Sequence, residues 1–214
     1  MPRKKFDIST LPKYPNLKIE KRLWTKGFLN LGGIDEAGRG ALAGDVAVAV
    51  VVLPNISDLT QILAGVRDSK QMTQRQREVL EPIIKEIAIT WGLGFASPTE
   101  IDQLGILPAT KLAAKKAVES LSIIPDYLIT DYLALPDIDL PQEKFIKGDM
   151  RSLTIASASV LAKTARDAKM RALDGEYPEY GFAQHKGYGT KKHREAIHKL
   201  GKSIVHRQSF NLKV

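Results

Sequence analysis

Residues 33–44 read GIDEAGRGALAG, in which two adjacent acids stand directly before an arginine that lies between two glycines. Residues 31–36 have the pattern of a strand that ends in these acids, and residues 46–53, nearly all valine and alanine, have that of a buried strand. About nine residues separate the two predicted strands, which is too few for a helical crossover. We therefore expect the two strands to pair antiparallel.

The rest of the chain predicts alternating helices and strands. Thr73 and Gln76 have the spacing of a capping box, and Pro82 should start or kink the helix that follows. Further helices are expected at 20–24, 108–121, 152–173 and 190–200, and further strands at 87–95, 127–131 and 145–148. This order predicts an α/β fold, a mixed sheet flanked by helices, with a basic helical C-terminal extension packed against its edge.

The composition indicates a globular domain and excludes several kinds of site. The 214 residues are 43% hydrophobic and 26% charged, which is typical of a globular domain. The chain has no cysteine, which excludes disulfides, thiolate zinc sites and cysteine nucleophiles. It has neither a signal-peptide pattern nor an apolar run long enough to cross a bilayer, so a cytoplasmic location is expected.

The net charge of +8 is unevenly distributed. Residues 1–149 hold 19 basic and 19 acidic side chains, whereas residues 150–214 hold 13 basic and 5 acidic ones and all four histidines. A basic end on a balanced body indicates a polyanion bound across that end. A basic surface that serves only solubility remains the alternative. His193 and His198 do not share a helix face, which argues against zinc.

Three predicted strands end at acids: Asp35 with Glu36, Asp131, and Asp149. Strand ends converge on one rim of an open α/β sheet, and oxygen ligands without histidine or cysteine suit Mg²⁺ or Mn²⁺. Two such ions can hydrolyse a phosphodiester. Neighbouring residues of a strand point to opposite faces. For Asp35 and Glu36 both to face the rim, the longer Glu36 side chain must reach around the strand or the chain must twist. Each acid could instead begin a solvated turn, and spacing alone does not choose among the acids of the chain.

The turn Gly38-Arg39-Gly40 does not fit a dinucleotide fingerprint, because a valine strand rather than a helix follows it. Such a turn can present backbone N–H and C=O groups to a 2′-hydroxyl, which both donates and accepts. Tyr188 stands between two glycines near Lys186, a pattern suited to stacking on a sugar or base. A tight hairpin with an exposed arginine, and a tyrosine that covers the edge of the core, are the alternatives.

Six stretches, taken in order, resemble bacterial ribonuclease HII over about residues 31–210. They are GIDEAGRGALAG (33–44), DSK (68–70), LITD (128–131), IKGD (146–149), SASVLAKTARD (157–167) and YGFAQHKGYGT (180–190). The resemblance implies a ribonuclease H-like catalytic core at 31–173 and a basic substrate-binding region at 174–214 packed on it. The polar, proline-bearing residues 1–30 outside the resemblance are expected to form an arm. The sister type, ribonuclease HIII, has a separate N-terminal domain for which thirty residues are too few.

The resemblance also implies an activity: metal-dependent cleavage of the RNA strand of RNA–DNA hybrids and nicking at ribonucleotides embedded in DNA, which leaves 3′-hydroxyl and 5′-phosphate ends and removes ribonucleotides from DNA. Its catalytic carboxylates, the ligands of two Mg²⁺ or Mn²⁺ ions, fall on Asp35, Glu36, Asp131 and Asp149. Its ribose-reading residues fall on Gly38, Arg39, Gly40 and Tyr188, and we add Ser69, Lys70 and Lys186 as candidate substrate contacts. We expect a monomer, with a sliding clamp as candidate partner.

The chain departs from the family pattern at Tyr132, where glycine is usual after the third carboxylate, and at Ala41 and Gly189, where proline is usual. We expect Asp167 to be a structural partner of Lys163 or Arg171 rather than a metal ligand. Two other functions stay open: a non-catalytic hybrid-binding protein of this fold, and a related nuclease that acts on DNA.

Overall fold

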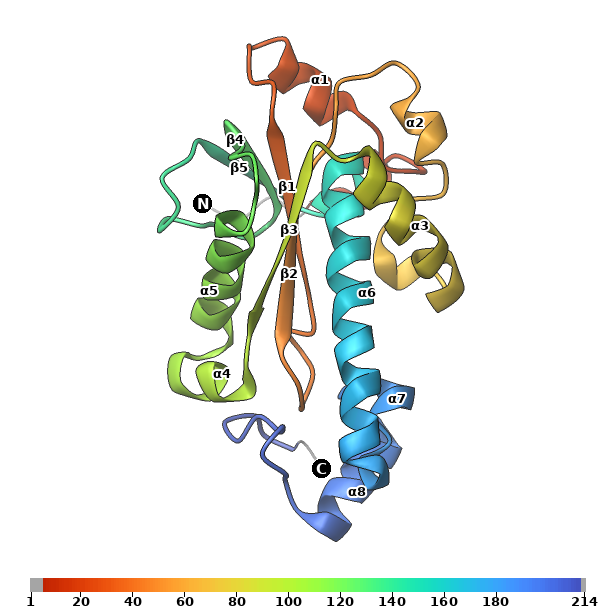
Figure 1. Ribbon diagram of the computed structural model, residues 1–214, viewed down its shortest axis with the longest axis vertical. Coiled ribbons are helices and arrows are strands. Elements are labelled where there is room, and N and C mark those ends of the chain that lie inside the picture. Colours follow the sequence, from red (N-terminus) through yellow and green to blue (C-terminus); the bar gives the residue numbers. More distant parts are fainter. Residues whose placement is uncertain (1–5, 213–214) are drawn as a thin grey trace.

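A five-stranded mixed sheet in the order β3-β2-β1-β4-β5 forms the centre of the structure, a computed structural model that describes residues 6–212 (Figure 1). Strand β1 pairs antiparallel with β2 and parallel with β4, and β4 pairs parallel with β5. The predicted mixed sheet and the antiparallel first pair are thus confirmed. The strands are β1 (Leu31–Ala37), β2 (Val46–Val52), β3 (Thr90–Ala96), β4 (Tyr127–Asp131) and β5 (Gln142–Phe145).

Helices cover both faces of the sheet (Figure 1). Helices α6 and α3 lie over one face, and α5 and α4 lie over the other. Helix α7 packs beside the C-terminal part of α6, and α8 lies near that end. The helices are α1 (Lys18–Trp24), α2 (Leu59–Ile62), α3 (Gln74–Ile87), α4 (Pro98–Leu104), α5 (Ile106–Glu119), α6 (Leu153–Glu176), α7 (Phe182–His185) and α8 (Lys191–Leu200). No helix among residues 6–212 is both long and apolar enough to span a membrane.

Helix α6 packs very closely on the central strand. A Cβ atom added to Gly33 would lie 2.7 Å from the backbone carbon of Thr154, so only glycine fits at this crossing. Small side chains on α6, Ala158 and Ala162 among them, are fully buried against the sheet. The helix therefore lies close enough to β1 for its polar residues to reach the end of that strand.

The N-terminus of α6 is capped by a distant acid. Ser152 Oγ and the Thr154 amide donate to Glu20 Oε1, at 2.5 and 3.0 Å. Glu20 lies on α1 and has no exposed surface, and burial raises the pKa of its carboxyl. An acid at a helix N-terminus satisfies backbone donors and complements the helix dipole, so α1 fixes where α6 begins.

Two sequence expectations differ from the structure. Helix α3 begins after the confirmed Thr73–Gln76 capping box and continues through Pro82, so it does not start at the proline, and the alternative of a kink at Pro82 stays a prediction. The last strand, β5, ends at Phe145 instead of running to 148. Asp149 consequently lies in a 3-10 turn, η3 (Gly148–Met150), and not at a strand end. The tetrapeptide of β5 is polar and lacks the alternation that would have marked it.

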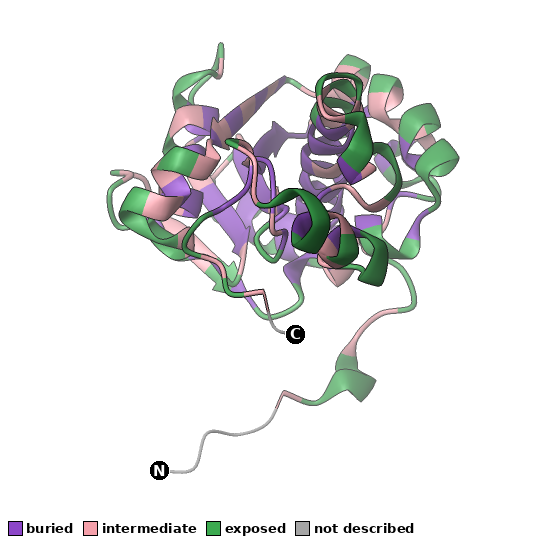
Figure 2. Ribbon diagram, turned by 90° about the horizontal axis from the view of Figure 1, so that it is seen from below, coloured by how far each residue is buried: buried purple, intermediate pink, exposed green. Residues whose placement is uncertain are grey.

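The C-terminal residues join the core near the glycine-rich turn. The Gly44 amide donates to the Val205 carbonyl at 2.8 Å, the Arg207 amide donates to the Leu42 carbonyl at 2.9 Å, and Ala43 forms an antiparallel bridge with His206. At the other end, the exposed turn η1 (Ile8–Thr10) stands away from the body (Figure 2). The division at residues 30 and 173 stays a prediction.

Candidate active site

The acids predicted to meet at one rim come from neighbouring parallel strands. Ile34 of β1 is the register partner of Thr130 of β4, so Asp35 and Asp131 follow side by side. The η3 turn brings Asp149 to the same place, because the Gly148 amide donates to Asp131 Oδ1 at 2.8 Å. Parallel pairing of β1, β4 and β5 therefore creates the acidic rim.

The rim acids are buried and repel one another. Asp35 is 4% exposed and Asp149 is 3% exposed. Burial, and then the neighbouring Glu36 charge, raise the pKa of Asp35 well above its usual value. Burial, and then Asp131, raise the pKa of Asp149 to about 7. Burial also raises the pKa of Asp131. Such a group of anions requires a cation or protons for neutrality.

Lys70 supplies part of the missing positive charge. Burial disfavours its charged form, but the surrounding acids, Asp35 first, hold the pKa of Lys70 above its ordinary value. Two oxygens of the rim acids still have no partner: Asp35 Oδ2 and Asp149 Oδ1 are buried without a hydrogen bond. Since buried carboxylate oxygens are normally satisfied, these two orphans mark the place where a cation would sit.

Glu36 faces the other side of the strand, as alternation requires. Asp35 shares its face with Ala37, which packs in the cluster formed with α6. Glu36 instead accepts a hydrogen bond from Arg39 Nη1 at 3.1 Å. Burial raises the pKa of Glu36, and the Arg39 charge works against that rise. In residues 6–212 no three acidic or histidine side chains are arranged to hold a metal ion. The side chains of Asp35, Asp131 and Asp149 would therefore have to shift to hold one together, and Glu36 would have to turn to join them.

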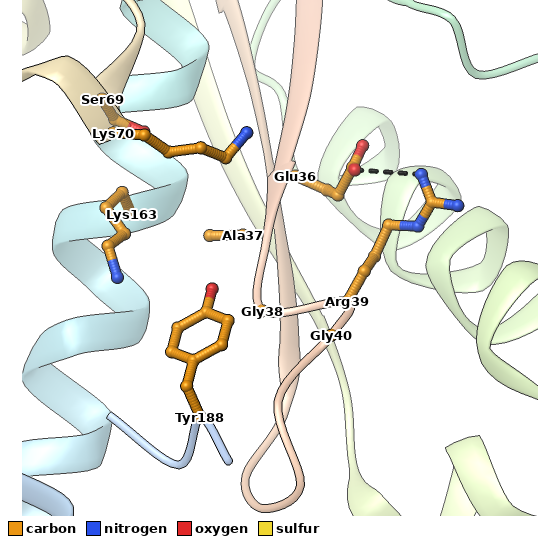
Figure 3. A pocket seen from close by; sticks show the side chains of 9 residues that line it. All are labelled: Glu36, Ala37, Gly38, Arg39, Gly40, Ser69, Lys70, Lys163 and Tyr188. Carbon is orange, nitrogen blue, oxygen red and sulfur yellow. Dashed lines mark hydrogen bonds and ion pairs between the residues drawn. The ribbon is translucent and has the colours of Figure 1, made fainter. Parts of the chain in front are cut away.

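A pocket of about 380 Å³ opens at Glu36, the residue that follows Asp35 (Figure 3). The predicted turn and Tyr188 form two of its sides, and the Lys70 side chain extends toward Ala37. Glu36 and Arg39 lie together on the side remote from Tyr188. The pocket is lined by Glu36, Ala37, Gly38, Arg39, Gly40, Ser69, Lys70, Lys163 and Tyr188.

The remaining candidates have different positions. Ser69 is 4% exposed, and its hydroxyl shares a 2.9 Å hydrogen bond with that of Ser159 on α6. Lys186 does not line the pocket; its ammonium group contacts the Ala183 carbonyl. Asp167 pairs with Lys163 at 2.7 Å and with Arg77 at 3.1 Å, which confirms the structural role expected of it and adds a partner.

Three basic residues in or near the pocket were not predicted from the sequence as site residues. Lys163 Nζ lies 5.3 Å from the centre of the Tyr188 ring, as does the Arg166 guanidinium carbon. Arg207 hydrogen-bonds to the glycine-rich turn. Lys163 could have been found from its place on α6 within the matching stretch. Arg207 could not, because it is 169 residues from Gly38 in sequence and carries no local pattern.

Comparison with known proteins gives this arrangement a family. The family model for ribonuclease HII matches residues 32–213. The chain belongs to the ribonuclease HII family. It is 51% identical to ribonuclease HII of Desulfitobacterium hafniense strain Y51 over 194 residues, which cover 91% of this chain and 73% of that protein. It is 48% identical to ribonuclease HII of Dehalococcoides mccartyi, with 92% of each chain covered.

Solved structures have the same fold. Ribonuclease H2 of Pyrococcus horikoshii superposes with a TM-score of 0.70 at 26% identity, covering 86% of this chain and 95% of that one. The expected resemblance and the ribonuclease H-like fold are therefore confirmed. Family membership makes the protein a type 2 ribonuclease H, a hydrolase that acts on RNA–DNA hybrids.

Proposed function

We propose that this ribonuclease HII nicks duplex DNA at single embedded ribonucleotides, as well as cleaving the RNA of hybrids, and so takes part in ribonucleotide removal. The proposal rests on one observation: the turn Gly38–Gly40 and Tyr188 line a pocket together with Glu36, the residue after Asp35, and Lys70, whose pKa the Asp35 charge raises. A ribose-sized recognition site beside a phosphodiester-cleaving rim suits a substrate with one ribonucleotide, because a lone 2′-hydroxyl is all that distinguishes it from DNA.

We propose that Asp35, Asp131 and Asp149, joined by Glu36, hold two Mg²⁺ or Mn²⁺ ions. The orphaned Asp35 Oδ2 and Asp149 Oδ1 atoms fit this role, since hard oxygen ligands suit these cations. A related protein, Bst-RNase HIII, was solved in complex with Mn²⁺; it is 19% identical to this chain, with a TM-score of 0.63. When bound, the ions would supply an activated water and neutralise the leaving oxygen.

The residues of the chain then perform the recognition steps. The backbone of Arg39 and Gly40 contacts the 2′-hydroxyl, and the Tyr188 ring packs on the sugar from the opposite side of the pocket. Lys70 and Lys163 line the same pocket and place positive charge where the phosphates pass. We assign Ser69 to orienting the Lys70 segment, through its hydrogen bond to Ser159, and leave Lys186 as a phosphate contact outside the pocket. Cleavage leaves 3′-hydroxyl and 5′-phosphate ends.

The partners and the domain roles are also proposals. Ribonuclease HII of Archaeoglobus fulgidus, 24% identical with a TM-score of 0.71, was solved in complex with PCNA, and on that basis a sliding clamp is our candidate protein partner. We propose that residues 174–214 bind substrate on the catalytic core, because the basic excess lies in the last third of the chain, that the protein is a monomer, and that it works in the cytoplasm.

The experiment is a nicking assay on three duplexes: one with a single ribonucleotide, one RNA–DNA hybrid and one of DNA alone. We expect cleavage of the first two with Mg²⁺ or Mn²⁺, none with EDTA, and none of the DNA duplex. A protein that binds the hybrid tightly but cuts neither substrate would be the non-catalytic binder considered above. Cleavage of the DNA duplex would indicate a nuclease without ribose selection.

A further inference from the structure

Two arginines near the pocket are completely buried and have no acidic partner. Arg166 and Arg207 each have no exposed surface, and within residues 6–212 neither forms an ion pair. Their guanidinium groups donate to backbone carbonyl oxygens instead. Burying an uncompensated cation is costly, so these carbonyl contacts must be specific to hold the groups in place.

Arg207 binds the inner side of the glycine-rich turn. Its Nη1 atom donates to the Arg39 carbonyl at 2.9 Å, and its Nη2 atom donates to the Gly38 carbonyl at 2.8 Å. Nε and Nη2 also donate to the Gly44 carbonyl, at 3.0 and 2.8 Å. The planar guanidinium thus ties both ends of residues 38–44 to one rigid group.

These contacts fix the direction of two peptide N–H groups. The described peptides are all trans, and in a trans peptide the C=O of one residue and the N–H of the next point in opposite directions. Since the carbonyls of Gly38 and Arg39 point inward to Arg207, the N–H groups of Arg39 and Gly40 point away from it. The pocket is lined by these same residues. Arg207 therefore orients the donors that a ribose hydroxyl would meet.

The neighbouring residue, His206, is connected through His193 to Tyr188, which lines the pocket. The Ser203 amide donates to His206 Nδ1 at 3.0 Å, so this nitrogen accepts and the His206 proton lies on Nε2. His206 Nε2 lies 3.1 Å from His193 Nε2, and His193 Nδ1 lies 3.0 Å from the Tyr188 carbonyl. The protons consequently follow one direction, from His206 to His193 and from His193 to the main chain of Tyr188.

We propose that His206 and Arg207 are positioning residues for ribose recognition: Arg207 orients the turn 38–40, and His206, through His193, fixes the main chain at Tyr188. Both come from one short segment that pairs with residues 42–44. The two sides of the reading site are thereby held by consecutive residues. This inference rests on the proposed reading of the 2′-hydroxyl by the turn and Tyr188.

The test compares the affinity for a duplex with one ribonucleotide and for the same duplex of DNA, both in EDTA so that no cleavage occurs. Arg207→Lys keeps a buried cation, but its three donors on one nitrogen cannot reproduce the four hydrogen bonds that the planar guanidinium makes from three nitrogens. We expect the preference for the ribonucleotide duplex to fall by about fivefold or more, the value of one misplaced hydrogen bond, with the affinity for DNA unchanged. Arg22→Lys is the control, since Arg22 pairs with Glu143 and neither residue lines the pocket.

A second pair of variants tests the contacts from His206 through His193 to the Tyr188 main chain. These variants keep the proposal testable if Arg207→Lys does not fold. His206→Gln places an amide donor where Nε2 was and should keep the preference, whereas His206→Leu removes the donor and should lower it. A folded Arg207→Lys protein with the wild-type preference would overturn the Arg207 assignment. Equal preference in His206→Leu and wild type would overturn the His206 assignment. A wild type without any ribose preference would instead refute the proposed function.

Discussion

Arg39 Nη1 donates to Glu36 Oε1 at 3.1 Å, so the arginine of the glycine-rich turn binds the acid that we propose joins Asp35, Asp131 and Asp149. This i,i+3 ion pair connects the turn that we propose reads the ribose with an acid that we propose binds metal. Because the Arg39 side chain is 44% exposed and that of Glu36 is 16% exposed, the pair is weak enough to open when substrate arrives.

Removing this arginine should change the ionisation of Glu36. Arg39 is the largest influence that lowers the pKa of Glu36, against the effect of burial. We therefore expect Arg39→Gln to raise the pKa of Glu36, measured by NMR titration of the metal-free protein. Arg75→Gln, on the exposed surface of α3, is the control. An unchanged Glu36 titration would mean that the ion pair is not formed in solution.

Neutralising Asp35 should abolish activity but raise stability. The raised pKa of Asp35 means that its charge destabilises the metal-free fold at neutral pH. Asp35→Asn should abolish cleavage and raise the unfolding temperature in EDTA by about 2–4 °C, equivalent to about 1 kcal/mol. Added Mg²⁺ should stabilise the wild type more than the variant.

Asp58→Asn provides the matched comparison, because Asp58 is exposed and makes no side-chain cap hydrogen bond. Asp58→Asn should change neither the cleavage rate nor the unfolding temperature. A fall in the unfolding temperature of Asp35→Asn would show that its carboxylate is not strained by its neighbours.

The two glycines of the turn should respond differently to alanine. A Cβ on Gly38 would lie 1.9 Å from Arg166 Nε, and its φ of +93° is unsuited to other residues. Gly38→Ala should therefore destabilise the fold by about 2 kcal/mol or more. A Cβ on Gly40 meets nothing within 4 Å, so Gly40→Ala should fold normally.

The Gly40 methyl group would, however, stand at the pocket, where a ribose must approach closely. We expect Gly40→Ala to lower kcat/KM at a single ribonucleotide by about tenfold or more, the effect of a small misplacement of substrate. Thermal unfolding and cleavage measured together check this. Normal cleavage by folded Gly40→Ala would remove Gly40 from the reading site.

The histidine pair should make stability depend on pH. Burial, opposed in part by the hydrogen bond to Tyr188, lowers the pKa of His193 to about 4, and burial, followed by the His193 charge, lowers that of His206 to about 4. The neighbouring His185 and Lys202 add to these effects. The unfolded chain then binds more protons than the folded one between pH 4 and 6.5.

Stability from this pair is therefore complete above pH 6.5 and declines as the pH falls toward 4. The two rings share one hydrogen bond, so we expect a joint loss on the order of 3 kcal/mol, measured by denaturant unfolding at several pH values. Replacing exposed His198 by glutamine should leave the curve unchanged, whereas His206→Leu should flatten it. An identical pH dependence in His206→Leu would contradict the assignment.

Parts of this site followed from local sequence rules. The convergence of Asp35 and Asp131 depends on strands ending at acids, and strand ends of parallel neighbours share a rim. The Thr73–Gln76 capping box is a local pattern and was confirmed. The orientation of Glu36 away from Asp35 follows from strand alternation alone.

Other features depend on tertiary contacts that no local pattern encodes. The contact of Arg207 with the turn and the capping of α6 by Glu20 join residues more than a hundred positions apart. Tyr132 has a positive φ of 55° directly after Asp131, a conformation that favours glycine or asparagine. Nothing in the sequence marks this backbone, although the family's usual glycine there is consistent with it.

The most direct test of the central claim is the rate of nicking of a duplex that contains one ribonucleotide, with Mn²⁺ or Mg²⁺, by wild type and by Asp35→Asn. The proposed arrangement predicts a cut at that nucleotide by the wild type, none by the variant, and equal binding by both in EDTA. A variant that still cuts, or a wild type that cuts the all-DNA duplex as fast, would contradict it.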